Sequence, residues 1–176
     1  MPEVLLVIVL VLFNGFFSLS EMAVITSRKA RLKEMARDSR GARVALELAE
    51  HPERFLSSVQ VWITLISLVT GYVGGDSLGS RLVGPLRDYI PVLAPYAVTI
   101  STILIFLMMA FFNVVIGELV PKRLATLRAE RLAAWLALPM VFFSRIMHPA
   151  VRLLAASTRL IMRLIGLGGL TEEKVT

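Results

Sequence analysis

The residues with the clearest potential for chemistry form the motif Gly117-Glu118-Leu119-Val120-Pro121-Lys122, at the end of a long apolar segment. Glu118 therefore places a carboxylate at or near membrane depth, where a charge is costly and usually functional. Pro121 has no N–H, so the carbonyl of Gly117, four residues earlier, is expected to lose its helical partner. A freed carbonyl beside a carboxylate, in an interrupted helix, is how transporters build cation sites. The alternative is that the motif only ends a membrane helix, with Lys122 and Arg123 as interfacial anchors.

The first apolar segment, about residues 4–25, carries a stripe of polar side chains. Asn14, Ser18 and Glu21 are spaced i, i+4 and i+7, which places them on one face of a helix. Ser20 points away from that face and joins it only if the helix is distorted. The alternative is that the serines bond to the carbonyl one turn earlier and favour close helix packing.

The second apolar segment, about residues 55–75, carries a parallel stripe formed by Gln60, Thr64, Ser67 and Gly71. Neutral oxygens of this kind are hard ligands, which suit Mg²⁺ or Ca²⁺ rather than soft metals. A tight seam between helices is the competing interpretation. In the third segment Asn113 lies one turn before Gly117, where it can ligate or orient an ion.

The composition defines the class of protein. The 176 residues are 56% hydrophobic with a mean hydropathy of +0.74, which indicates an integral membrane protein. The net charge of +6 comes from basic residues beside apolar segments, a pattern that fits anionic lipid headgroups better than nucleic acid. With no cysteine and two histidines, a disulfide framework is excluded and a zinc or iron cage is not expected. No His or Lys lies within a predicted span where it could activate a membrane serine as a nucleophile. We therefore do not expect the protein to be an enzyme.

The hydropathy pattern predicts an all-α membrane protein with three transmembrane helices, at about residues 4–25, 55–75 and 96–117. Residues 74–95 are expected to link the second and third helices outside the cell. A polar helical segment, about residues 28–50, begins with a basic cluster directly after the first span. Basic residues favour the cytoplasmic side, so we predict a multi-pass protein of the plasma (inner) membrane with its N-terminus outside.

The last segment, about residues 132–168, is apolar but carries a basic stripe. The stripe is formed by Arg145, Arg152 and Arg159. We expect a basic amphipathic juxtamembrane helix in the headgroup plane, broken at Pro139 and Pro149. The alternative is a fourth, short or tilted crossing. The transmembrane domain is thus expected to cover residues 1–170, and residues 171–176 to begin a linker to a soluble domain.

Three stretches resemble the motifs of the cyclin-M-like magnesium transporters, the CNNM/CorC family. They are Asn14-Gly15-Phe16-Phe17-Ser18-Leu19-Ser20-Glu21-Met22-Ala23, Ser58-Val59-Gln60-Val61-Trp62-Ile63-Thr64-Leu65-Ile66-Ser67, and the Gly117–Lys122 motif. The resemblance covers essentially the whole chain, and the last motif is the most specific. Two departures are Trp62, where glycine is expected, and Ser67, where many members carry asparagine.

The resemblance implies a homodimer, a juxtamembrane belt helix, and cytosolic nucleotide-binding (CBS) domains elsewhere on the full-length chain. It also implies Mg²⁺ export coupled to Na⁺ entry. The expected site residues are the hydroxyls of Ser18 and Ser67 with help from Asn14, Ser20 or Thr64, the carbonyl of Gly117, the charge of Glu118, and Asn113 as a ligand or orienting group. The alternative function is a non-transporting anchor, whose spans dimerise and tether the cytosolic domains.

Overall fold

The computed structural model describes residues 2–166, leaving aside the side chains of residues 76, 77 and 93, and all regular secondary structure in this part of the chain is helical. The helices are α1 (Pro2–Thr26), α2 (Lys29–Met35), α3 (Arg40–Glu50), α4 (Pro52–Tyr89), α5 (Ala97–Val114), α6 (Val120–Leu127) and α7 (Ala129–Leu164). A 3₁₀ segment, η1 (Pro91–Tyr96), leads into α5, and a π-helical segment, η2 (Val115–Leu119), joins α5 to α6. The all-α prediction is confirmed; the expected linker at residues 171–176 lies outside the described residues.

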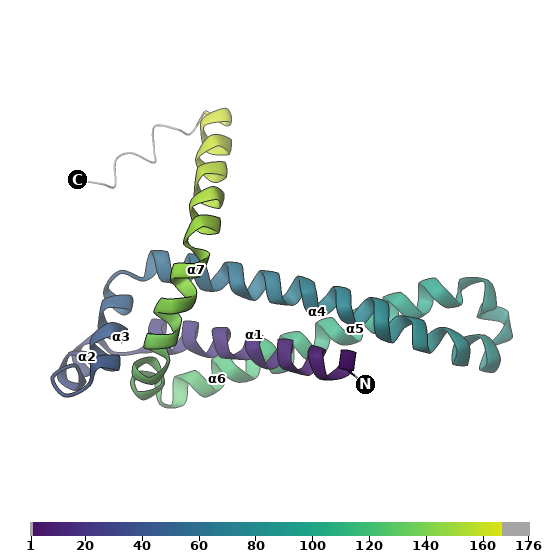
Figure 1. Cartoon of the computed structure of the whole chain (residues 1–176), viewed down its shortest axis with the longest axis horizontal. Helices are drawn as coiled ribbons and strands as arrows, with labels where there is room; N and C mark the ends of the chain where they lie inside the picture. The colour runs from purple at the N-terminus through teal and green to yellow at the C-terminus, as the bar shows by residue number, and fades with distance from the viewer. Residues whose placement is uncertain (1, 167–176) are drawn as a thin grey trace.

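Four helical stretches of the described chain are long and apolar enough to cross a membrane. They are Pro2–Thr26, Pro52–Tyr89, Ala94–Leu127 and Ala129–Leu164. The first three contain the predicted spans and pack side by side as an elongated bundle, in which α4 and α5 extend beyond the N-terminus of α1 (Figure 1). Large apolar side chains such as Leu68 and Phe106 are exposed on the bundle, as expected for a surface that contacts lipid. The fold is that of a multi-pass membrane protein.

Helix α4 is longer than we expected. The glycine cluster near Gly74 was expected to begin an external link, but the helix continues through it to Tyr89. These glycines bring α5 close, since a Cβ added at Gly74 would lie 2.6 Å from Met109 Cγ and one at Gly79 would lie 3.5 Å from Thr102 Cα. Glycines that look like helix breakers in the sequence therefore form a close helix–helix contact, which membrane helices tolerate well.

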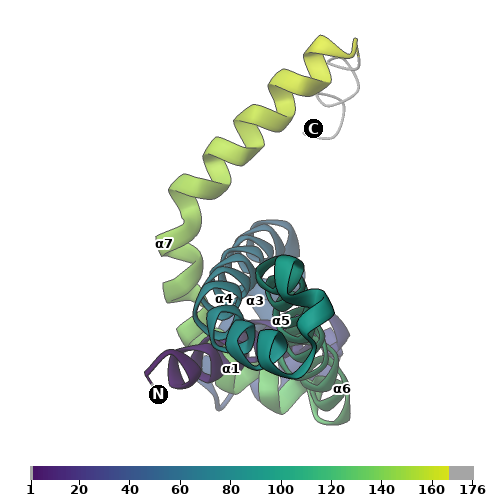
Figure 2. The same ribbon diagram turned by 90° about the vertical axis from the view of Figure 1, so that its right-hand side faces the viewer.

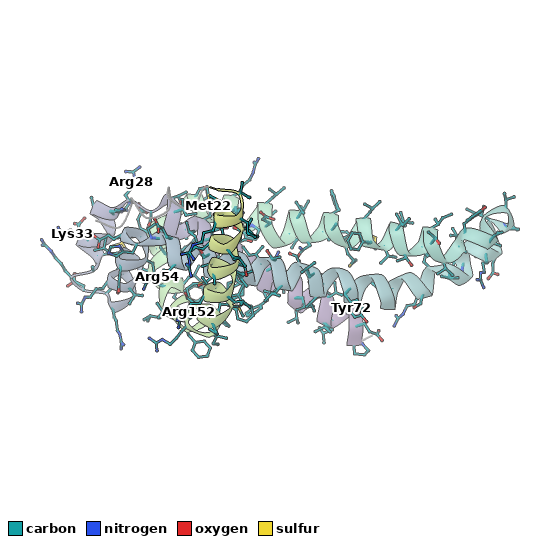
Figure 3. All side chains as sticks on the ribbon, turned by 90° about the horizontal axis from the view of Figure 1, so that it is seen from above. Met22, Arg28, Lys33, Arg54, Tyr72 and Arg152 are labelled. Atoms are coloured by element: carbon teal, nitrogen blue, oxygen red, sulfur yellow. The ribbon has the colours of Figure 1, made fainter. Side chains whose placement is uncertain are left out.

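The polar segment after α1 folds into two short helices at one end of the bundle (Figure 1). Arg28 and Lys33 lie at this end with Arg54, whereas Tyr72 lies far along the other half of the molecule (Figure 3). The basic cluster that follows α1 therefore lies at one end of the bundle. The expected break at His51-Pro52 is confirmed, because α3 ends at Glu50 and α4 begins at Pro52.

Helix α7 starts inside the bundle and then leaves it (Figure 2). Its buried residues all lie between Ala129 and Met140, and Phe143 and Ser144 still form hydrogen bonds with Trp62 and Ser58 of α4. The C-terminal part of α7 then extends away from the other helices (Figure 1). The expected breaks at Pro139 and Pro149 are wrong, because both prolines lie inside one continuous helix. A proline removes only one backbone bond, and the strong helix formers on either side continue the helix. Whether α7 crosses the membrane or lies along it stays a prediction.

Candidate functional site

Asn113 of α5 lies at the centre of a hydrogen-bonded chain of polar side chains from three helices. Its Nδ2 donates to Ser67 Oγ of α4 at 2.9 Å. Its Oδ1 accepts from Asn14 Nδ2 of α1 at 3.2 Å. Three residues predicted to belong to the site are therefore in direct contact, although they come from separate segments of the sequence.

Gly117 of η2 lies directly against this chain. A Cβ added there would lie 3.0 Å from both Asn113 Oδ1 and Asn14 Nδ2, and 3.3 Å from the Val11 carbonyl oxygen. A side chain at this position would push the two amides apart. The site therefore requires glycine for close approach, whatever its carbonyl does.

The backbone beside Gly117 is a π-helical turn rather than a helix end. In η2 the hydrogen bonds skip one residue further than in an α-helix, as shown by the bond from the Val120 N–H to the Val115 carbonyl. The helix then continues into α6 with Pro121 in its first turn, and a Cβ at Gly15 of α1 would lie 3.1 Å from Pro121 Cγ. Single π-turns are frequent at functional sites because they disturb the regular ladder of carbonyls. The free carbonyl of Gly117 stays a prediction.

Two buried oxygens on α1 have no hydrogen-bond partner among the described residues: Asn14 Oδ1 and Ser18 Oγ. Both side chains are fully buried. Leaving a buried polar atom unpaired costs about 1–3 kcal/mol, so such atoms are rare without a reason. Unpaired oxygens on one helix face, beside the amide of Asn113, are what a hard cation needs as ligands.

A cavity of about 410 Å³ opens between α4 and α5 beside this chain. Four predicted site residues line it: Thr64, Ser67, Asn113 and Glu118. Its remaining lining is largely apolar and includes Leu68, Phe106 and Met109. The cavity gives the polar chain an opening toward the surface of the bundle.

Two predicted site residues have hydroxyls that are already engaged by their own helix. Ser20 Oγ donates to the Phe16 carbonyl at 2.7 Å, and α1 shows none of the distortion that would turn this side chain toward Asn14. Thr64 Oγ1 donates to the Gln60 carbonyl at 2.9 Å, on an exposed part of α4. Each hydroxyl keeps an acceptor lone pair, but neither is an unpaired group.

Three charged side chains, those of Glu21, Glu118 and Lys122, form ion pairs beside the site. Lys122 Nζ lies 2.7 Å from Glu118 Oε1 and 3.5 Å from Glu21 Oε2 of α1. Glu118 was expected to supply charge, whereas the participation of Glu21 and Lys122 was not recognised. Helical spacing in the sequence does indicate both residues. Glu21 shares the helix face of Asn14 and Ser18, and Lys122 follows Glu118 by one helical turn.

Ser101 of α5 carries a further buried hydroxyl, but it does not line the cavity. It is fully buried, and its Oγ has no partner in the part of the chain that the structure describes. Among the side chains that the structure describes, no group of three or more His, Cys, Asp or Glu residues gathers to hold a metal ion. The site is therefore a cluster of neutral oxygens beside two carboxylates, an arrangement suited to weak binding of a hard cation.

The chain is similar to several known proteins. A family model described as the cyclin M transmembrane N-terminal domain matches residues 5–176. UPF0053 protein sll0260 of Synechocystis sp. is 42% identical over 179 residues, covering 98% of this chain and 40% of that protein. UPF0053 protein YhdP of Bacillus subtilis is 33% identical over 174 residues, covering 98% and 39%. The polyamine export protein of Haemophilus influenzae is 27% identical over 177 residues, covering 98% and 40%. The chain thus spans about two fifths of the length of these relatives.

Proposed function

The chain belongs to the family of the cyclin M transmembrane N-terminal domain, and on that basis we propose that it binds and transports a divalent cation, Mg²⁺. The observation that carries this proposal is the pair of unpaired buried oxygens, Asn14 Oδ1 and Ser18 Oγ. Both side chains lie on one face of α1, and the Asn14 amide donates a hydrogen bond to Asn113 of α5. An anchor without transport has no need for buried oxygens without partners, because each of them destabilises the fold.

In this proposal the ion binds among side-chain oxygens of α1, α4 and α5. Ser18, Asn14, Asn113 and Ser67 provide oxygen ligands, and the carbonyl of Gly117 adds one from the π-turn. Glu118 attracts the ion through its charge from the wall of the cavity. Because the ligands are mostly neutral and Mg²⁺ gives up water reluctantly, binding is weak, which suits an ion that must leave again.

The wider proposal follows the family resemblance. We propose that the chain acts as a homodimer, exports Mg²⁺ in exchange for Na⁺, and works with cytosolic domains of a longer protein. We place its N-terminus outside the plasma membrane. These parts of the proposal rest on the resemblance and the charge distribution rather than on contacts in the bundle.

The experiment compares two serines of the same helix. Ser18 and Ser20 are both fully buried, but only the Ser18 hydroxyl lacks a partner. We expect Ser18→Ala to lower the Mg²⁺ affinity of the purified protein by about tenfold, measured by titration calorimetry. Ser20→Ala, the matched control, should change it less than about twofold. Equal affinities in both variants and wild type would favour the anchor.

A second candidate cargo is an organic polyamine. The specific observation is that the carboxylates of Glu118 and Glu21 already accommodate a primary ammonium group, that of Lys122. One relative is named a polyamine export protein. The cavity beside Glu118 is also lined by apolar side chains that suit methylene groups. Competition of 1,4-diaminobutane with Mg²⁺ in the same titration separates the two cargoes, since a polyamine carrier binds the diamine more tightly.

A further inference from the structure

The side chain of Lys122 occupies a position between two carboxylates from different elements. Glu21 comes from α1 and Glu118 from η2, and the ammonium contacts both, at 3.5 and 2.7 Å. The exposed fractions of the three side chains are 13% for Glu21, 31% for Lys122 and 37% for Glu118. The group is therefore partly shielded, so these contacts are stronger than those of an exposed surface pair.

The position of Glu118 connects this group with the cavity. Glu118 lines the cavity together with Asn113 and Ser67, so a cation entering there meets a carboxylate that already holds an ammonium. Glu21, Glu118 and Lys122 carry one net negative charge between them. Without the lysine charge the same group would carry two, and a divalent cation would be held far more strongly.

Resting on the proposed function, we propose that Lys122 is a tethered cation that competes with the transported cation for Glu118. While the lysine is in place, the carboxylate charge is neutralised and an ion in the polar chain is released readily. When a cation arrives, the ammonium moves aside on its flexible four-carbon stem toward solvent, where it is already partly exposed. Lys122 thus sets the affinity of the site without being one of its ligands.

A purely structural salt bridge makes the opposite prediction. If Lys122 only holds Glu118 in position, removing its charge disorders the carboxylate and weakens cation binding. If Lys122 competes, removing its charge frees the carboxylate and tightens binding. The sign of the change in affinity therefore separates the two roles.

The first test measures Mg²⁺ affinity by titration calorimetry in Lys122→Gln. We expect affinity to rise on the order of tenfold, because one competing charge is lost beside a divalent ion. Arg123→Gln is the matched control: the same charge is lost one residue away, from an exposed side chain without an ion pair in the described chain. This control should change affinity less than about threefold. Lys122→Arg, which keeps the charge, should resemble wild type.

Unchanged or weaker Mg²⁺ binding in Lys122→Gln would overturn the competing role. Retained helical content by circular dichroism is the condition for comparing the variants. If Lys122→Gln does not fold, Lys122→Met keeps the aliphatic stem and removes the same charge.

A second test does not depend on Mg²⁺ transport. Lys122→Ala leaves the carboxylates of Glu21 and Glu118 without their ammonium, and added ethylammonium should take its place. We expect ethylammonium to raise the melting temperature of Lys122→Ala by about 2 °C or more and to leave wild type unchanged. If wild type binds no Mg²⁺ but ethylammonium stabilises Lys122→Ala, the proposed cargo is wrong. The binding position for an ammonium group between Glu21 and Glu118 is then still supported. If ethylammonium stabilises neither protein, the competing role of Lys122 is wrong.

Discussion

Replacing Gly117 by alanine is the sharpest test of how the site is assembled. The new Cβ would lie 3.0 Å from Asn113 Oδ1 and from Asn14 Nδ2, atoms that are themselves 3.2 Å apart in a hydrogen bond. Moving only one of these side chains does not suffice, because the Val11 carbonyl oxygen of the backbone also lies 3.3 Å away. We therefore expect Gly117→Ala to separate the two amides and open the polar chain.

Two effects on stability oppose each other in this variant. Losing the hydrogen bond between the buried amide of Asn14 and the half-buried amide of Asn113 costs about 1–3 kcal/mol, because the Asn14 Nδ2 and Asn113 Oδ1 atoms lose their partner. Replacing a helical glycine by alanine returns about 1 kcal/mol of helix propensity. The net change in the free energy of unfolding should thus be a loss of about 0–2 kcal/mol. Mg²⁺ affinity should fall at least tenfold, since the amide oxygens no longer converge.

Gly75→Ala provides the control for this experiment. Gly75 also lies within a long helix, but a Cβ added there meets nothing within 4 Å. This variant should gain about 1 kcal/mol from propensity alone and keep its ion affinity. Thermal unfolding and titration calorimetry on both variants measure the two quantities. Full Mg²⁺ affinity in Gly117→Ala would refute the argument that Asn14, Asn113 and Gly117 form one site.

Three further predictions address the neighbouring elements. Pro121→Ala restores a backbone N–H that can capture the Gly117 carbonyl, so slower hydrogen exchange in η2 should accompany weaker Mg²⁺ binding; unchanged Mg²⁺ binding would make the motif a structural one. Trp62→Phe removes the bond from Nε1 to the Phe143 carbonyl, 3.2 Å long, and should lower the free energy of unfolding by about 1 kcal/mol in a denaturant titration; no loss would mean that this bond does not attach α7 to the bundle. Thr171→Cys in the cysteine-free chain should react with an impermeant maleimide only from the cytoplasmic side, and reaction from outside the cell would establish α7 as a fourth crossing.

The sequence alone determined the class of the fold and located its apolar segments, but it did not give the full length of α4 or the continuity of α7. Hydropathy and helical periodicity are local properties, so the apolar segments, the basic cluster after Thr26 and the break at His51-Pro52 could be located without a structure. The candidate residues Asn14, Ser67 and Asn113 were found in the same way, because polar groups in apolar helices are costly and therefore conspicuous. Gly117 was found from Pro121, whose missing N–H is expected to free the carbonyl four residues earlier.

Only the tertiary structure decided which of these residues meet. The bond between Asn14 and Asn113 spans 99 residues of sequence and the bond between Asn113 and Ser67 spans 46, so both depend on how the helices are packed in register. Helix packing likewise made Gly74 a close contact rather than the start of a link, and it brought Lys122 between carboxylates of two elements. A local pattern fixes the face on which a side chain lies, whereas its partner is fixed by packing between helices that are distant in the sequence.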